Sequence, residues 1–309
     1  MSKLCVCIEG QLRGAKHCGP TIKKYLIDKY NADLYFYVQN YEQHNPEDFK
    51  YYGPSKKQIV YNNPTPNFTN IFDNLCEKFG YNKQLWRQTF KSISSQNYTL
   101  GFQKPGTCIR RMYNRYLIYN ELKDMDYDWF VIMRSDLFFV NYFTDINKIK
   151  QDALNIYRKC NWKGYNNNLI VFHKNNIEKI LTYIKTFLNG SFLKFALQTK
   201  QKNVNEERFF KYNMDIKNIK PNYINNVWYT SADSIKGFTT WAKIKIANNG
   251  DIYKYKEEYD DAMTRHINKA KPINQKPKNI KLNNILLHKK LLHLQMFKKL
   301  KSFNRLKLL

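Results

Sequence analysis

The chain has 309 residues, of which 43% are hydrophobic and 16% aromatic, and this composition excludes a disordered or low-complexity protein. Its formal net charge of +27 indicates a polyanionic partner and leaves nucleic acid, an anionic membrane surface and phosphorylated small molecules open. No run of about 18 apolar residues and no signal-peptide core occurs, so we expect a cytoplasmic protein without a spanning helix. The cysteines show no Cys-x-x-Cys spacing, which favours reduced, buried thiols.

The first part of the chain alternates strands and helices in the way that is typical of an α/β fold. An apolar run at Leu4–Ile8 stops at a glycine turn, as a buried parallel strand does before a loop at its carboxyl end. Residues 19–31 follow with a helical pattern in which Pro20 suits the first turn. Residues 32–40 and 58–62 predict the next two strands, which gives a βαβ unit.

The rest of the chain continues this alternation. A helix is predicted after an N-cap at Thr107, because apolar residues from Ile109 to Asn120 recur at intervals of three and four. The polar segment 84–106 predicts a long loop. Further segments predict strands at 129–133, 137–140, 168–174 and 226–231, and helices at 69–79, 175–188 and 203–214.

A charged trio interrupts two apolar runs in the segment DWFVIMRSDLFF. Arg134, Ser135 and Asp136 follow the predicted strand 129–133, and loops at the carboxyl ends of strands form the ligand crevice of an open α/β sheet. A buried carboxylate is costly unless it is paired or binds a cation. Asp136 could hold a divalent cation that bridges diphosphate oxygens, with Arg134 on a phosphate. The alternative is a structural Arg–Asp pair at a β-bulge.

The loop after the first strand has the residues that a phosphate site needs. Gly10 and Gly14 allow a tight turn and close backbone approach, and Arg13 supplies positive charge. Arg111 lies near the start of the helix after Thr107, where phosphate can bind. A glycine turn with solvated arginines is the alternative. Together with the trio, the loop indicates a nucleotide-diphosphate site.

Three short motifs resemble those of GT-A-fold glycosyltransferases found in large DNA viruses and scattered through bacteria and algae. They are Gly-Gln-Leu-Arg at 10–13, Arg-Ser-Asp-Leu at 134–137 and Asn-Glu-Glu-Arg-Phe-Phe at 205–210. The resemblance covers roughly residues 3–230. It implies a GT-A-like, Rossmann-like α/β fold with a mixed sheet flanked by helices, and a viral enzyme of glycan biosynthesis.

The resemblance also implies a nucleotide-sugar donor, commonly a UDP- or GDP-sugar, and Mn²⁺ or Mg²⁺ held by an Asp-x-Asp triplet. This chain has Arg134 where the first acid stands, so Asp136 is left as the metal ligand and Arg134 would do part of the cation's work. Literal Asp-x-Asp spacings at 124–126 and 126–128 precede the strand and are interpreted as turn residues. The residues expected at the donor are Gly10, Gln11, Arg13, Arg111, Arg134, Ser135 and Asp136.

The acceptor side needs a base and groups that hold a sugar. Glu207 is the candidate base, with Glu206 as second choice, because both open a predicted helix within the third motif. Acids that merely favour a helix start are the alternative. Trp162 could stack on a sugar face while Asn167 and Asn168 bond its hydroxyls, although an ordinary polar turn has the same composition.

The sequence divides into a catalytic domain at 1–262 and a basic tail at 263–309, because the composition changes to Lys, Asn, Leu and Ile. Residues 284–309 predict a basic amphipathic helix without acids, which is typical of peripheral contact with an anionic membrane surface. A docking helix for a protein and a nucleic-acid-binding tail are the alternatives. The protein would then work in the cytoplasm, that of the host if it is viral, on the cytosolic face of a membrane.

We expect an enzyme that transfers a sugar from a nucleotide-diphosphate donor to a glycan, glycoprotein or lipid-linked acceptor. One rival is a nucleic-acid-binding protein, which the net charge of +27 motivates. The charge is concentrated in the tail, so no specific nucleic acid is expected. The other rival is an inactive scaffold of the same fold, which the missing first acid supports.

Overall fold

The computed structural model describes residues 2–39, 45–61, 107–191, 205–225, 227–232 and 245–270, with isolated positions between 73 and 84. Met1–Ile267 form one compact unit and Asn268–Leu309 another. The predicted loop 84–106 lies almost wholly outside the described residues, and the amphipathic helix 284–309 lies entirely outside them. Within the described part, no helix is long and apolar enough to cross a membrane.

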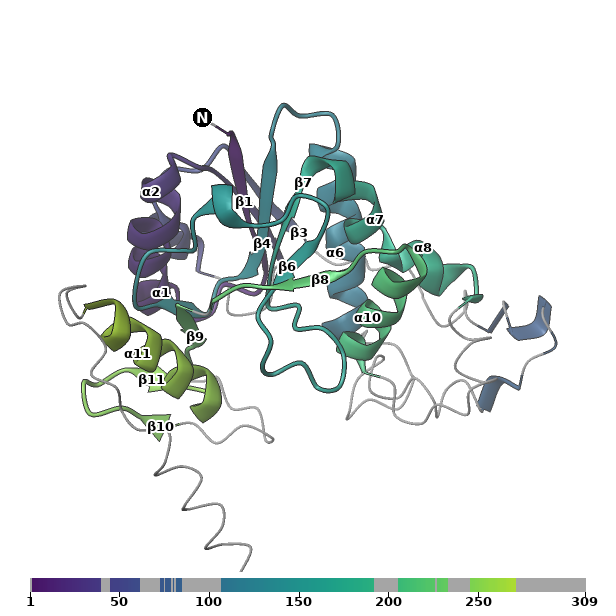
Figure 1. Ribbon diagram of the computed structural model, residues 1–309. Helices are drawn as coiled ribbons and strands as arrows, with labels where there is room; N and C mark the ends of the chain where they lie inside the picture. The colour runs from purple at the N-terminus through teal and green to yellow at the C-terminus, as the bar shows by residue number, and fades with distance from the viewer. Residues whose placement is uncertain are drawn as a thin grey trace, which may run out of the picture. The chain divides into compact units, whose positions relative to one another are not determined.

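A seven-stranded mixed sheet forms the centre of the larger unit, in the order β3-β2-β1-β4-β7-β6-β8 (Figure 1). β1, β2, β3 and β4 run parallel, and β7 is antiparallel to both β4 and β6. The strands are β1 Leu4–Gly10, β2 Asp33–Gln39, β3 Lys57–Tyr61, β4 Trp129–Arg134, β6 Leu154–Ile156, β7 Leu169–His173 and β8 Pro221–Tyr223. The predicted mixed α/β sheet flanked by helices is therefore confirmed.

Two short two-stranded sheets lie beside the main one. β5 (Leu137–Phe139) pairs with β9 (Trp228–Thr230), and β10 (Lys245–Ile246) pairs with β11 (Ile252–Tyr253). The sequence predicted the apolar runs of β5 and β9 as strands. They form a separate ladder because the turn at 135–136 takes the chain out of the main sheet directly after β4.

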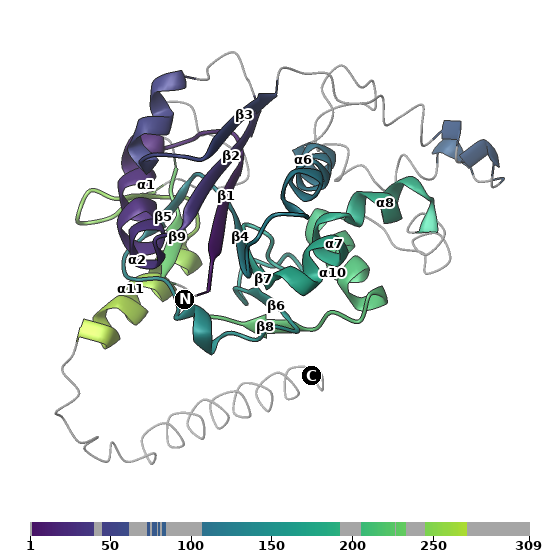
Figure 2. The same ribbon diagram turned by 90° about the horizontal axis from the view of Figure 1, so that it is seen from above.

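Helices cover both faces of the main sheet (Figure 2). α1 and α2 lie on one face, and α6, α7, α8 and α10 lie on the other. The helices are α1 Ala15–Ile22, α2 Asp28–Tyr30, α6 Thr107–Leu122, α7 Ile177–Leu181, α8 Tyr183–Leu188, α10 Glu206–Ile216 and α11 Lys256–Ala270, with a π-helix at Lys23–Ile27 and 3₁₀ turns at Pro46–Tyr52, Ile146–Lys148 and Lys174–Asn176. α11 runs through the predicted domain boundary at residue 262.

The first helix starts earlier than the sequence suggested. It begins at Ala15, so Pro20 lies inside α1 and not in its first turn. Because proline has no backbone N–H, the regular i to i−4 bonding is interrupted there. The chain continues as the π-helix Lys23–Ile27, whose wider bonding pattern follows directly after the disturbed turn.

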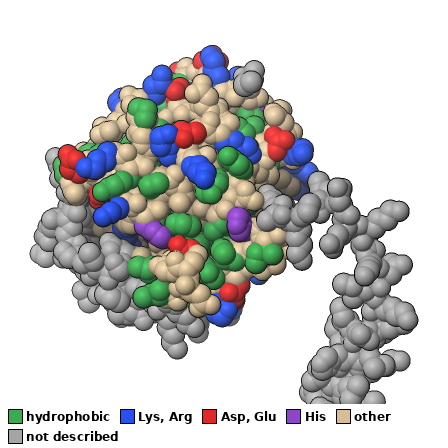
Figure 3. All heavy atoms as spheres, turned by 90° about the vertical axis from the view of Figure 1, so that its left-hand side faces the viewer, with side chains coloured by type: hydrophobic (Ala, Val, Ile, Leu, Met, Phe, Trp, Pro, Cys, Tyr) green, Lys and Arg blue, Asp and Glu red, His purple; other side chains and the backbone are tan. Residues whose placement is uncertain are grey.

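Charge is interspersed on the face that lies to the left in Figure 1. Figure 3 shows Lys and Arg side chains there among acidic, apolar and neutral ones. Several lysines of the described surface pair with acids, such as Lys23 with Asp28 at 2.6 Å and Lys50 with Glu47 at 2.8 Å. Such exposed pairs add little stability, but they leave this face without a continuous basic stripe.

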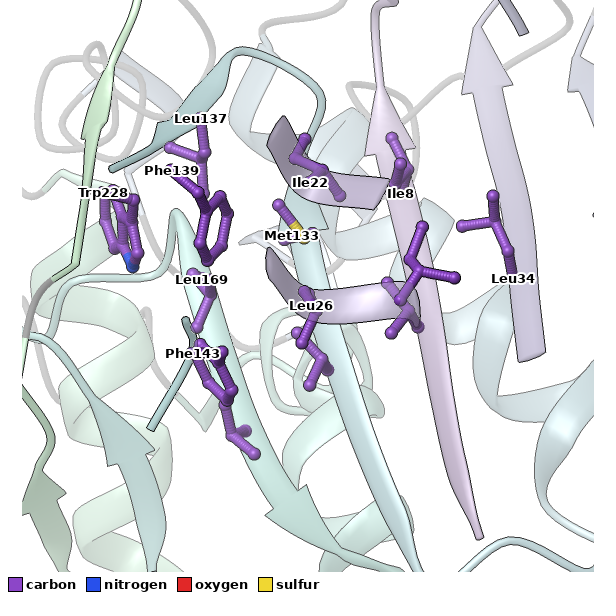
Figure 4. Close-up of a cluster of buried hydrophobic side chains, with 14 of the residues drawn as sticks. Ile8, Ile22, Leu26, Leu34, Met133, Leu137, Phe139, Phe143, Leu169 and Trp228 are labelled. Carbon is purple, nitrogen blue, oxygen red and sulfur yellow. The ribbon is translucent and has the colours of Figure 1, made fainter. Parts of the chain in front are cut away.

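One core lies between the sheet and α1 (Figure 4). Ile8 of β1, Met133 of β4 and Leu169 of β7 are fully buried there. Ile22 of α1 and Leu26 of the following π-helix pack over them. The second core lies on the α6 face of the sheet, so the central strands are buried on both faces, as their unbroken apolar runs predict.

A buried ion pair joins β1 to the helix on the second face. Cys5, Cys7 and Glu9 alternate along β1 and share that face, because side chains of a strand alternate. Arg115 of α6 is fully buried and donates from Nη2 to Glu9 Oε1 at 2.6 Å and from Nε at 3.1 Å. The same Nη2 donates to the Asn167 carbonyl at 2.8 Å.

Replacing Arg115 with Met is expected to lower the free energy of unfolding by about 3–5 kcal/mol, because Glu9 would stay buried without its partner. Arg111 Nε, at 3.8 Å from Glu9, is too far away to replace the lost hydrogen bonds. The double variant Glu9→Leu/Arg115→Met is expected to recover most of the loss. Urea unfolding measures both, and a double variant less stable than the single one would contradict the account.

Candidate functional site

The strand order reverses direction between β1 and β4. The chain passes outward from β1 to β2 and β3, and β4 then pairs on the other side of β1. Glu9 is in register with Arg134, so the loops at 11–14 and 135–136 leave the same edge of the sheet side by side. Open α/β sheets bind ligands at such a switch point, outside the carboxyl ends of their strands.

Ser135 ties the two loops together. Its Oγ accepts a hydrogen bond from the Arg13 backbone N–H at 3.0 Å and donates to the Gln11 carbonyl at 2.6 Å. Tyr52 Oη donates to the Ser135 carbonyl at 3.1 Å. Gly10, at φ +89°, makes the turn that starts the first loop. Because Ser135 is 1% exposed, it acts by holding the Arg13 loop in place.

Arg134 and Asp136 form a two-point ion pair at the end of β4. Arg134 donates from Nε to Asp136 Oδ1 at 2.8 Å and from Nη2 to Oδ2. Its Nη1 reaches Asn168 Oδ1 at 3.3 Å. Burial alone would raise the pKa of Asp136, but the charges of Arg134 and Lys254 outweigh it and hold the pKa below its usual value. Asp136 is therefore ionised and paired.

These residues do not fit a divalent cation. Both Asp136 oxygens accept hydrogen bonds from Arg134, which stands where a second acid would be needed. No group of three metal-ligating side chains occurs in the part of the chain that the structure describes. The literal Asp-x-Asp spacings at 124–126 and 126–128 lie at the amino end of β4, where Asp126 pairs with Lys3.

Lys254 reaches this site from the far end of the chain, between β11 and α11. Its backbone N–H donates to the Thr230 carbonyl at 2.9 Å, and the neighbouring Ser231 N–H donates to the Asp136 carbonyl at 2.8 Å. Lys254 is 5% exposed. Burial lowers its pKa to about 8, and the charge of Arg134 adds to this shift while Asp136 opposes it.

The N-terminus of α10 carries two acids with different surroundings. Asn205 caps the helix by accepting from the backbone N–H three residues later. Glu206 is buried, with Oε2 accepting from Arg111 Nη1 at 3.1 Å and Oε1 accepting from Tyr183 Oη at 3.0 Å. Arg111 Nη1 also donates to Asn167 Oδ1 at 2.8 Å. Glu206, Arg111 and Asn167 thus form one network.

Glu207 is the acid suited to proton transfer. Burial raises the pKa of its carboxyl to about 7, the charge of Glu206 adds to this, and Arg111 and Arg134 oppose it. The side chain remains partly exposed. An acid with a pKa near neutrality is well placed to act as a general base. The hydrogen bonds from Glu206 through Arg111 to Asn167, whose neighbour Asn168 contacts Arg134, connect the start of α10 to the ion pair.

A loop docks on the α10 N-terminus and fixes the backbone of Glu207. Tyr165 N–H donates to the Glu207 carbonyl at 3.0 Å, and Asn205 Nδ2 donates to the Trp162 carbonyl at 3.0 Å. Gly164 fits here because it has no side chain, since a Cβ would lie 2.0 Å from the Glu207 carbonyl carbon. The loop and the helix start therefore form one rigid corner.

The same loop presents an exposed tryptophan in a strained conformation. Cys160, Trp162 and Lys163 have φ values of +52°, +46° and +70°, which are costly for residues other than glycine. Trp162 is 51% exposed, and its ring lies 6.5 Å from that of Tyr255, edge to face. The loop therefore presents a flat aromatic surface, and its backbone carbonyl at Trp162 is held by the N-cap residue Asn205 of α10.

The structure gathers the predicted donor residues at this edge of the sheet. Gln11 Oε1 accepts from Arg13 Nε at 2.5 Å, which holds that guanidinium above the loop. Sequence reasoning missed Glu9 and Lys254, and it considered Arg115 for phosphate, whereas the structure pairs Arg115 with Glu9. Glu9 stands directly before the glycine turn, and an acid ending an apolar strand was a usable signal. Lys254 is one lysine among many, and no local pattern marks it.

The comparisons with known proteins assign no family. No protein-family model matches the chain, and no curated protein matches its sequence. Among solved structures, the apo form of mouse xyloside xylosyltransferase 1 is similar, with 9% identity and a TM-score of 0.41 over 72% of this chain and 85% of that one. A likeness this distant assigns no activity, so the geometry of the site carries the functional argument.

Replacing Gly164 with Ala is expected to lower the free energy of unfolding by about 3 kcal/mol, because the new Cβ would collide with the Glu207 backbone. Gly250→Ala is the matched control. Gly250 has φ +85° and open space around it, so only backbone strain of about 1 kcal/mol should appear. Urea unfolding compares the two variants, and equal losses would mean that the corner is not tightly packed.

Proposed function

We propose that the protein is a glycosyltransferase that moves a sugar from a nucleotide-diphosphate donor to a hydroxyl acceptor. One observation carries the proposal: Glu207, with a pKa of about 7, shares a switch-point site with the cations Arg134 and Lys254. The arrangement offers a base for the acceptor and positive charge for the leaving group. The resemblance of the three motifs to GT-A-fold enzymes supports the same reaction.

The donor diphosphate would lie over the loops after β1 and β4. Arg13 and Arg134 would contact its oxygens, and the turn at Gly10 would let the backbone approach. Arg111 is connected to the site by its hydrogen bonds to Glu206 and Asn167. A UDP- or GDP-sugar is the donor that the motif resemblance implies.

The transfer step follows from these positions. Glu207 accepts the proton of the acceptor hydroxyl as the oxygen bonds to the anomeric carbon of the sugar. The bond between that carbon and the donor phosphate breaks, and its electron pair leaves with the nucleoside diphosphate. The developing negative charge is stabilised by cations fixed before the reaction begins, which costs no reorganisation in the transition state.

The acceptor would be a glycan or a glycan-bearing protein or lipid. Trp162 offers an exposed aromatic surface of the size of a sugar ring, on the loop that is bonded to the N-cap of α10. Asn168 accepts from Arg134, whereas Asn167 is 1% exposed and acts on the site through Arg111. This assignment makes Trp162 the residue that holds the acceptor.

The rival functions have less support in the described part of the chain. The face in Figure 3 has no continuous basic stripe of the kind that follows a nucleic-acid backbone. A carboxyl whose pKa is raised to about 7 suits an enzyme better than an inactive scaffold, because perturbed pKa values cluster at functional sites. Contact of 284–309 with an anionic membrane, and with it the cytosolic location, remains a prediction on residues outside the described structure.

Replacing Glu207 with Gln is expected to lower kcat by about 10²–10⁴-fold while nucleotide binding persists, because the base is lost. In the unchanged protein, kcat should rise with pH through about 7, falling tenfold per pH unit below it. Release of nucleoside diphosphate from a panel of UDP- and GDP-sugars, between pH 5 and 9, measures both.

The control for this variant is Glu257→Gln, which neutralises an exposed acid in the first turn of α11. It should keep the unchanged rate and pH profile. If no nucleotide sugar is turned over, the transferase assignment fails. If Glu207→Gln keeps full activity, the base lies elsewhere.

Replacing Trp162 with Ala is expected to raise the acceptor KM about tenfold, with the donor KM unchanged, because the stacking surface is removed. Tyr142→Ala is the control, since Tyr142 is 49% exposed and packs edge to face against Tyr25, which precedes β2 in the chain. Initial rates at varied donor and acceptor concentrations separate the two constants. A change confined to the donor KM would move Trp162 to the donor side.

A further inference from the structure

Several cations gather around Asp136. Arg134 pairs with Asp136 through the two-point contact, and Arg13 and Lys254 both act on Asp136 electrostatically as additional cations. The acid Glu258 acts on Lys254 as well, so cations and acids are interleaved here. The diphosphate of a nucleotide sugar carries negative charge, for which Arg13, Arg134 and Lys254 are the cations at the carboxyl ends of β1 and β4.

We infer that the protein binds the nucleoside diphosphate with its own cations, Arg13, Arg134 and Lys254, and without a divalent metal. The inference rests on the proposed function and specifies how that site holds its donor. Guanidinium and ammonium groups are strong phosphate ligands, and Arg adds a planar pair of donors. Side-chain cations of the protein thus take the place of a metal ion that would have to bind from solution.

The Arg134–Asp136 pair occupies the oxygens that a metal ion would need. A metal at Asp136 would have to displace the Nε and Nη2 hydrogen bonds and would leave a mostly buried guanidinium beside a second positive charge. Removing one partner of a buried pair is strongly unfavourable. The pair thus holds Arg134 in place, with Nη1 directed to Asn168, at the edge where the diphosphate would arrive.

Backbone hydrogen bonds hold Lys254 near this pair. The bridge between Ser231 and Tyr253, together with the Lys254 N–H bond to Thr230, attaches the β11 end to β9. β9 pairs with β5 directly after Asp136. The two-stranded sheet of β10 and β11 therefore brings Lys254 to the loop at 135–136.

The burial of Lys254 affects the stability of its charged form. A lysine that is 5% exposed and near two arginines is destabilised as an ammonium ion. The acid Glu258 also acts on Lys254, but Glu258 is buried, its pKa is raised, and one of its oxygens is bonded to the Thr230 N–H at 2.8 Å. An incoming diphosphate would add negative charge near this ammonium group and so favour its charged form.

Isothermal titration of UDP, GDP, UMP and GMP into the full chain tests the inference, once with EDTA and once with MnCl₂. We expect one diphosphate to bind in EDTA with an affinity that Mn²⁺ changes less than about threefold. Lys254→Met should weaken diphosphate binding about 10–100-fold and monophosphate binding much less, because one charged contact is lost. Lys254→Arg should restore most of it.

Lys256→Met is the matched control, because Lys256 lies two residues away, is exposed and pairs with Asp260. It should bind as the unchanged protein does. Arg13→Met repeats the test at a partly exposed position and does not depend on the folding of the Lys254 variants.

The outcomes separate the two proposals. Diphosphate binding that needs Mn²⁺ would overturn the inference and leave the transferase assignment standing. Full affinity of Lys254→Met and Arg13→Met in EDTA would also overturn it. Absence of nucleotide binding in both buffers would overturn the inference and the proposed function together.

Discussion

The parallel pairing of β1 with β4 is the constraint on which the site depends. It fixes Glu9 opposite Arg134, and from that register the loops at 11–14 and 135–136 emerge together. A shift by one residue would turn every side chain of β1 to the other face and would separate Glu9 from Arg115. The register is favoured because a slip would turn the charged Glu9 from Arg115 into the apolar core on the other face.

Buried charge is distributed through this region in an ordered way. The Glu9–Arg115 and Arg134–Asp136 pairs have both partners in place, and Glu206 has Arg111 and Tyr183. Glu207 and Lys254 differ, since burial moves both pKa values toward neutrality. The paired groups build the framework. Groups with shifted pKa values are candidates for a reaction, and the proposed function uses these two.

The sequence was sufficient for features that local patterns determine. The strands at Leu4–Gly10 and Trp129–Arg134 are unbroken apolar runs, and the predicted meeting of their loops follows from sheet geometry alone. It left two interpretations of Asp136 open, because pairing with Arg134 and binding a cation use the same residues. It missed Lys254 and the Glu9–Arg115 pair, because both depend on contacts between distant segments. Pro20 was misplaced because burial of α1 outweighs the local preference of proline.

The attachment of the β11 end to β9 has a consequence for synthesis. β1, β4 and the Arg134–Asp136 pair are encoded in the first half of the chain, whereas Lys254 is translated near its end. A nascent chain can thus pair β1 with β4 well before Lys254 leaves the ribosome. If the diphosphate is held as we infer, chains that stop short of Lys254 would have the two loops in place but would be unable to capture the donor.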